Sequence, residues 1–244
     1  MNSQGKLEAL LGSARLELYL DKADGNVERA ADLYRWATEL SGVLHGQLSY
    51  VEIAVRNALD RQLQEWNEVR GFGRDWTAED QTADPLYELM GRELRAARKH
   101  AALAAAEREA DHHRHGAAVN HDDILTQLTF GKWVHLIYNP RGEHASRVTL
   151  WAEATHRAFE RSAHADAYTL DSERARLLIG RQLHDLRRLR NRVAHHENLL
   201  SVNVKGRLDL ILSMLARIDP NYLGYVARQN PIRTIIKQDP RRQW

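Results

Sequence analysis

The residues best suited to chemistry lie together in one short stretch, LRRLRNRVAHHE at 186–197. It combines four arginines, an asparagine, two adjacent histidines and a glutamate. Arginine holds a phosphate through two parallel hydrogen bonds and stays charged at any physiological pH. Histidine exchanges a proton near neutral pH and is also a common metal ligand. The stretch therefore suits an acidic substrate, a metal ion or a solvated basic surface, and helical geometry separates these alternatives.

Helical spacing brings three of these side chains together. An apolar stripe in steps of four and three residues leads up to them: Ile179, Leu183 and Leu186. Arg190 is the next member of that stripe. At about 100° per residue, Asn191 lies about 100° and His195 about 140° further round, and the small Ala194 leaves space beside them. The spacing predicts a catalytic group of Arg190, Asn191 and His195 around a small hollow.

This group suits attack of an RNA 2′-hydroxyl on the neighbouring phosphate, a reaction that needs neither a metal nor a cysteine. The arginine would hold the phosphate, and the histidine would move the proton. The asparagine would fix the histidine tautomer or a phosphate oxygen. A structural role is the alternative, because arginine-rich helix ends are common and a histidine near a helix C-terminus interacts favourably with the helix dipole. No cofactor and no metal ion are expected.

Other charged residues are secondary candidates. In VEIAVRNAL at 51–59, Glu52 and Arg56 are one helical turn apart, and Asn57 follows. This spacing predicts either a structural ion pair on a largely buried helix or a group that supports an active site. Three more arginines are expected to contact an RNA backbone or solvent: Arg187, Arg188 and Arg192.

Two further motifs attract structural explanations. Four histidines at 112–121 could ligate a metal, but the stretch has the composition of a loop, so we expect solvated side chains: His112, His113, His115 and His121. FGKW at 130–133 could stack on a base beside its lysine. Aromatic residues in helix cores are commoner, and we expect that role here.

The composition excludes several protein classes. The 244 residues carry a formal net charge of +2 and include no cysteine, which rules out disulfides, thiolate catalysis and cysteine-based zinc sites. No apolar run approaches the roughly 20 residues of a membrane-spanning helix. The N-terminus also lacks the pattern of a signal peptide. We therefore expect a cytoplasmic protein that does not contact a membrane.

The elements that must position these residues are predicted to be helices. Apolar residues recur at three- and four-residue steps over four ranges: 27–66, 85–108, 172–195 and 204–219. Gly42 and Gly46 suggest a bend or break in the first range, and strand signals are weak throughout. We predict an all-α fold with an N-terminal helix and turn at 1–26, a helical domain at 27–220 and a basic C-terminal tail at 221–244. The end of that tail is expected to be solvated.

Three segments resemble the Abi-like family of abortive-infection HEPN proteins and follow the family's order. They are AADLYRWATELSGVLHGQLSYVEIAVRNAL at 30–59, LTFGKWVHL at 128–136 and LRNRVAHHENLL at 189–200. In the last segment, Arg190, Asn191 and His195 resemble the HEPN motif of an arginine, a polar residue and, after a short gap, a histidine. His196 satisfies the same pattern. We favour His195, because on a continuous helix it shares an arc with Asn191.

The resemblance implies an all-α HEPN-type helical bundle with peripheral helices. It also implies a homodimer with the motif at the interface, where two copies would face a shared cleft. The implied activity is that of a metal-independent endoribonuclease acting in antiphage defence or as a toxin. RNA would be its partner, and a cognate antitoxin or noncoding RNA would be a second one.

By motif position, Arg190 would bind and polarise the phosphate, Asn191 would orient it, and His195 would act as general base or acid. Further candidates for a catalytic or supporting role are His196, Glu52, Arg56 and Asn57. One alternative is an HEPN module that binds RNA or a nucleotide without cutting it and works with a partner. Another is a helical interaction protein whose arginine-rich helix forms a dimer interface.

Overall fold

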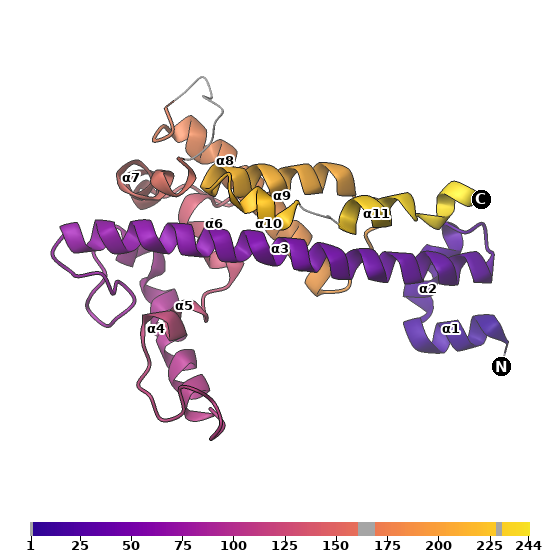
Figure 1. Ribbon diagram of the computed structural model, residues 1–244, viewed down its shortest axis with the longest axis horizontal. Coiled ribbons are helices and arrows are strands. Elements are labelled where there is room, and N and C mark those ends of the chain that lie inside the picture. Colours follow the sequence, from indigo (N-terminus) through magenta and orange to yellow (C-terminus); the bar gives the residue numbers. More distant parts are fainter. Residues whose placement is uncertain (1, 161–168, 228–230) are drawn as a thin grey trace. The chain divides into compact units, whose positions relative to one another are not determined.

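The computed structural model describes residues 2–160, 169–227 and 231–244, and all regular structure in these ranges is helical (Figure 1). The predicted all-α class is confirmed. In the described ranges, no helix is both long and apolar enough to cross a membrane. The α-helices and two 3-10 turns follow in chain order: α1 Ser3–Leu11, α2 Ser13–Asp21, α3 Val27–Val69, α4 Leu86–Ala106, α5 His121–Leu125, α6 Phe130–Ile137, α7 Ala145–Glu153, η1 Thr155–Phe159, α8 Glu173–Ala194, α9 Val204–Ile218, α10 Tyr222–Val226, α11 Pro231–Lys237 and η2 Pro240–Gln243.

The longest element is α3, which begins where the sequence predicts a helix. The side chain of Asn26 accepts a hydrogen bond from the backbone N–H of Arg29 at 3.0 Å and so caps the first turn. Gly42 and Gly46 do not break the helix, contrary to the suggestion from their sequence. The buried apolar stripe keeps its period on both sides of them, and this packing outweighs the low helix propensity of two exposed glycines.

The chain divides into two compact units. Unit 1 comprises Met1–Tyr50, Leu189–Leu212 and Leu223–Trp244. Unit 2 comprises Val51–Arg188 and Ser213–Tyr222. The motif residues from Arg190 to His196 therefore belong to unit 1.

Unit 1 includes the end of the chain, which packs against the first half of α3 (Figure 1). The indole N–H of Trp36 donates to the carbonyl of Ile235 at 2.8 Å, in a buried position. Ile232 is fully buried, and the guanidinium of Arg241 lies 5.4 Å from the Trp36 ring centre. The predicted tail at 221–244 includes residues 228–230, which lie outside the described ones. For α11 the expectation of a solvated end was wrong, because isoleucines at helical spacing bury one face, whereas η2 has no buried residue.

Unit 2 is organised around α4, which contacts α5, α6 and α7. Two buried arginines hold the C-terminal end of α6. The guanidinium of Arg147 donates to the carbonyl of His135, and that of Arg176 to the carbonyl of Ile137, both at 2.8 Å. Both guanidiniums also pair with Glu143. They satisfy carbonyls that a helix end leaves without intrahelical partners.

The helix α8 carries the predicted catalytic stretch on its last turns. Its apolar stripe is buried as predicted and continues to the end of the helix: Ile179, Leu183, Leu186, Leu189 and Val193. Arg190, one step along from Leu189, is half-buried. The stripe thus fixes which face of α8 the motif residues can present.

Candidate functional site

The helix α8 ends at Ala194, and the two histidines form the turn that stops it. The backbone N–H of His196 donates to the carbonyl of Val193 at 3.1 Å, and that of Glu197 donates to the carbonyl of Arg192 at 2.9 Å. His196 has a φ of 53°, in the left-handed region. These two bonds around a left-handed residue form a Schellman motif. The His196 side chain therefore does not continue the helical arrangement of the side chains on α8.

A histidine is an unusual choice for this left-handed position. Glycine normally occupies it, because a Cβ in the left-handed region costs roughly 1–2 kcal/mol. Backbone strain of this kind is concentrated at functional sites. His196 is also exposed, so packing of its side chain does not account for the conformation. Asp24 and Asp80 have similar φ values, of 50° and 56°.

The other predicted catalytic residues lie just before this turn. Arg190 and Asn191 are half-buried on the last turns of α8, and His195 is exposed immediately after the helix. The backbone N–H of His195 donates to the carbonyl of Asn191 at 2.9 Å. His195 is favoured in the sequence because it shares an arc with Asn191 on a continuous helix. The helix α8 ends at Ala194, so this geometric argument does not apply to His196.

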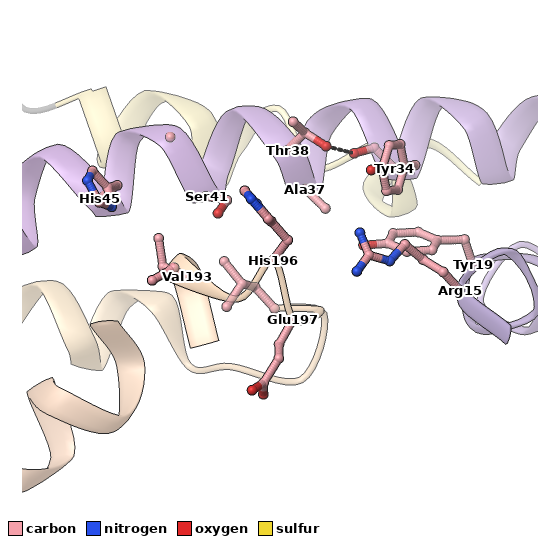
Figure 2. A pocket seen from close by; sticks show the side chains of 13 residues that line it. Arg15, Tyr19, Tyr34, Ala37, Thr38, Ser41, His45, Val193, His196 and Glu197 are labelled. Carbon is pink, nitrogen blue, oxygen red and sulfur yellow. Dashed lines mark hydrogen bonds between the residues drawn. The ribbon is translucent and has the colours of Figure 1, made fainter. Parts of the chain in front are cut away.

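A cavity of about 530 Å³ opens beside the turn, within unit 1. Residues of α2, of α3 and of the turn after α8 line it (Figure 2). The imidazole of His196 points toward α3, whereas the carboxylate of Glu197 points away from it (Figure 2). Of the predicted site residues that the structure describes, His196 lines the cavity, and Arg190, Asn191 and His195 do not. The polar side chains that line the cavity are those of Arg15, Tyr19, Tyr34, Thr38, Ser41, His45, His196 and Glu197.

Two tyrosines form one wall of this cavity. The ring of Tyr19 on α2 meets that of Tyr34 on α3 edge to face, with centroids 5.1 Å apart. Burial raises the pKa of Tyr19, and the proximity of Tyr34 raises it further, although Arg15 acts in the opposite direction. The Tyr19 hydroxyl therefore stays protonated at neutral pH and can donate a hydrogen bond. The cavity thus combines two aromatic rings, a guanidinium and two imidazoles.

A family model described as Abi-like protein matches residues 16–201, which is most of the chain. The chain belongs to the Abi-like protein family. The match runs from α2 to the turn after α8, so it includes every residue that lines the cavity except Arg15. A search of the curated proteins and a search of the solved structures found no match.

In this Abi-like protein, the candidates on the second half of α3 belong to unit 2. The guanidinium Nε of Arg56 donates to the side-chain oxygen of Asn57 at 3.1 Å. Glu52 and Arg56 are half-buried, and Asn57 is exposed. Ile53, expected on a largely buried helix, is 49% exposed. This part of α3 therefore keeps one face in solvent.

The three arginines expected to contact RNA have different surroundings. Arg188 is exposed, whereas Arg187 is half-buried in unit 2. Arg192 donates to the carbonyl of Asn198 and forms an ion pair with Glu197 at 3.6 Å. These contacts tie the end of α8 to the loop that follows, so Arg192 stabilises the turn that carries the histidines.

The histidine cluster at 112–121 separates into two environments. Three members are exposed as expected: His112, His113 and His115. The expectation was wrong for His121, which begins α5 and contacts the carboxylates of Asp60 and Asp75, each at 2.9 Å. Burial lowers the pKa of His121, but hydrogen bonds and attraction from the two carboxylates outweigh this, and the pKa is raised. In the described parts of the chain, no group of three or more histidine, aspartate or glutamate side chains is arranged to hold a metal ion.

Sequence reasoning missed the α2 and α3 sides of the cavity. A polar stripe on α3 was present in the sequence at steps of four, three and four residues: Tyr34, Thr38, Ser41 and His45. It lies beside the apolar stripe from which the helix was predicted. No comparable signal marks Arg15 and Tyr19, because only the packing of α2 brings them to the cavity.

Proposed function

We propose that this Abi-like protein is a metal-independent endoribonuclease of the HEPN type, acting in abortive-infection defence or as a toxin. One observation carries the proposal: Arg190 and Asn191 lead directly into a strained turn that directs His196 into a polar cavity. His195 occupies the same turn and is exposed. Family membership supports the defence role.

In the proposed reaction, one histidine takes the proton of an RNA 2′-hydroxyl. The 2′-oxygen then attacks the adjacent phosphorus, and the bond from phosphorus to the 5′-oxygen breaks. A second histidine gives a proton to that leaving oxygen. The products are a 2′,3′-cyclic phosphate and a 5′-hydroxyl. Arg190 would neutralise charge on the phosphorane-like transition state, because its guanidinium remains cationic throughout.

The proposal includes a homodimer with the motif at its interface. One chain directs His196 into the cavity, while Arg190, Asn191 and His195 lie outside its lining. A second copy facing the same turn would bring these residues to a shared strand of RNA. We further propose that a cognate antitoxin or noncoding RNA restrains the active dimer.

The test is cleavage of a labelled single-stranded RNA by the purified full-length chain in excess EDTA. We expect 2′,3′-cyclic phosphate ends from the wild type and at least a hundredfold slower cleavage by Arg190→Ala and His195→Ala. Arg181→Ala is the matched control, because Arg181 is exposed on the same helix and its loss removes the same charge.

Cleavage that survives both active-site substitutions would contradict the assignment of the site. Cleavage abolished by EDTA would contradict the metal-independent mechanism. A chain that remains monomeric during cleavage, measured by light scattering, would remove the dimer from the proposal.

The cavity itself favours a second candidate, a module that binds a nucleotide or RNA without cutting it. Tyr19 and Tyr34 offer aromatic surfaces for a base, and Arg15 offers a cation for a phosphate. Base stacking of this kind contributes about 1–3 kcal/mol per base. Salt-sensitive RNA binding without cleavage would favour this candidate, and Tyr34→Ala would then weaken binding at least about fivefold.

A further inference from the structure

A second cavity, of about 390 Å³, lies wholly in unit 2. Residues of α4, α6 and α8 line it, together with the turn that follows α6. None of the residues in the proposed catalytic group belongs to it. Its volume is within the range of pockets that bind small ligands, roughly 300–1,000 Å³.

Positive charge dominates the lining of this cavity. Four cationic side chains face a single carboxylate, that of Glu93: Arg92, Lys132, Arg141 and Arg187. Glu93 accepts hydrogen bonds from Lys132 at 2.8 Å and from Arg92 at 3.2 Å. One carboxylate cannot neutralise four cations, so the cavity keeps a net positive charge.

The side chain of Arg187 lies beside the motif FGKW. Phe130 and Trp133 are buried in the core as expected, but the two residues between them line the cavity. A Cβ placed on Gly131 would be 3.4 Å from the guanidinium Nη1 of Arg187 and 3.5 Å from its Cδ. These are ordinary van der Waals distances, so the Arg187 side chain lies against the first turn of α6, and a side chain longer than a methyl group would crowd it.

The guanidinium Nε of Arg187 is buried and has no hydrogen-bond partner among the described atoms. A buried charged donor without an acceptor is costly, and an unsatisfied group in a native structure calls for an explanation. An anion in the cavity that Arg187 lines would offset the charge of this guanidinium. Arginine also binds phosphate oxygens with two of its donors at once.

The pKa values of two histidines at the cavity are lowered by burial and by nearby positive charge. Burial lowers the pKa of His184, and Arg187 lowers it further. Burial also lowers the pKa of His135, followed by the charge of Arg147. Both imidazoles are therefore neutral at pH 7, and each keeps a nitrogen donor and a nitrogen acceptor. The ring of His184 meets that of Tyr138 edge to face, with centroids 5.7 Å apart.

We propose that this cavity binds the phosphate groups of a nucleotide, either free or within an RNA strand. Arg187 and Lys132 contact the phosphate, and Arg141 closes the cavity from the turn after α6. Tyr138 and His184 provide flat surfaces and hydrogen-bonding atoms for the base. The site is separate from the proposed catalytic group and does not depend on whether that group cleaves RNA.

The test is isothermal titration calorimetry on the full-length chain in EDTA, with four probes. They are ATP, pyrophosphate, adenosine and a short 2′-O-methylated RNA, which cannot be cleaved through its 2′-oxygen. We expect ATP, RNA or both to bind, pyrophosphate to compete with them, and adenosine not to bind. Binding of ATP alone identifies a free nucleotide as the ligand, and binding of RNA alone identifies a strand.

Arg187→Gln and Lys132→Gln are expected to weaken binding at least about tenfold, because each removes charge-assisted hydrogen bonds. Gly131→Leu is expected to do the same without a change in charge, since its side chain fills the cavity. Arg181→Gln, at an exposed position of the same helix and with the same change in charge, should alter binding less than about threefold.

Equal losses in Arg187→Gln and Arg181→Gln would overturn the proposal, because they would show a diffuse charge effect. Loss of binding in Arg190→Ala with full binding in Gly131→Leu would also overturn it, since the ligand would then occupy the other unit. No binding of any phosphate-containing probe would overturn it outright. If Arg187→Gln does not fold, judged by circular dichroism, Lys132→Gln and Gly131→Leu decide.

Discussion

Unit 2 buries charged side chains in its core, whereas the buried residues described in unit 1 include none. Unit 2 encloses Asp60, Arg147 and Arg176 in hydrogen-bonded networks, and the buried polar residue of unit 1 is Gln47. Buried charges are costly unless every partner is present. The core of unit 2 therefore includes charged groups that must keep their partners, whereas the described core of unit 1 is apolar apart from Gln47.

The two cavities also differ in how many charged side chains line them. The unit 1 cavity combines rings, hydroxyls and imidazoles with few charges, and the unit 2 cavity is lined by four cations. Proton transfer needs groups that titrate near neutral pH, whereas phosphate binding needs permanent charge. Under the two proposals, unit 1 carries the chemistry and unit 2 binds the phosphate.

The largest effect on stability is expected from Arg176→Ala in unit 2. Arg176 is fully buried, and its loss leaves the carbonyl of Ile137 and one oxygen of Glu143 without their donor. Leaving a buried carbonyl without its donor costs about 1–3 kcal/mol, and the space left by the truncated side chain adds to that loss. Urea unfolding followed by circular dichroism measures this loss.

Arg174→Ala is the matched control, because Arg174 is exposed two residues earlier on α8. Its effect should stay within about 0.5 kcal/mol. A loss below about 1 kcal/mol in Arg176→Ala would remove the distinction between the two cores.

His196→Gly should separate activity from stability in unit 1. Glycine keeps the left-handed turn and relieves its strain, so the free energy of unfolding should be unchanged or rise by up to about 1 kcal/mol. Cleavage of RNA should slow at least a hundredfold, because the imidazole is gone. Thermal unfolding and the RNA cleavage assay test the two halves of this prediction.

Glu197→Gln serves as the comparison variant, since Glu197 is on the same turn but points away from α3 (Figure 2). It should change cleavage less than about threefold. If His196→Gly lost activity and stability together, the imidazole would be a structural group.

The smallest effect is a pH dependence in unit 2. The pKa of His121 is raised in the folded protein above its usual 6.5. The contribution of its ion pairs is therefore complete below pH 6.5 and is lost as the pH rises through the raised value. Hydrogen bonds to charged groups contribute about 1.5–3 kcal/mol, so His121→Gln should cost about that much at pH 6 and less at pH 9.

Urea unfolding of the wild type and His121→Gln at several pH values gives the difference that belongs to His121. His135 and His184 have lowered pKa values, so they act in the opposite sense, below pH 6.5. A difference that stays constant from pH 6 to 9 would mean that His121 is not charged in the fold.

Much of the fold follows from periodic apolar residues. The stripe on α8 predicts a helix that ends within a residue of Ala194, and the stripe on α3 predicts the longest element. Periodicity does not reveal His121, because its carboxylate partners are 61 and 46 residues away in the chain. Nor does it reveal the packing of Ile235 on Trp36 across 199 residues.

The site was predictable in part. The motif identifies Arg190, Asn191 and the two histidines, since their types and spacing carry the chemistry. The left-handed turn at His196 has no sequence signal, because the usual marker, a glycine, is absent. The sequence also gives no signal for the cavity, because the cavity depends on where α2 packs.

The strained turn has an evolutionary consequence. If the imidazole at 196 had no function, selection for stability would favour glycine there, because glycine adopts the left-handed conformation without strain. Under the proposed function, selection for activity and selection for stability therefore act against each other at a single codon. Descendants that keep the helix end but encode glycine at this position are expected to have lost the activity. The identity of one residue thus becomes a marker of which lineages still use the site.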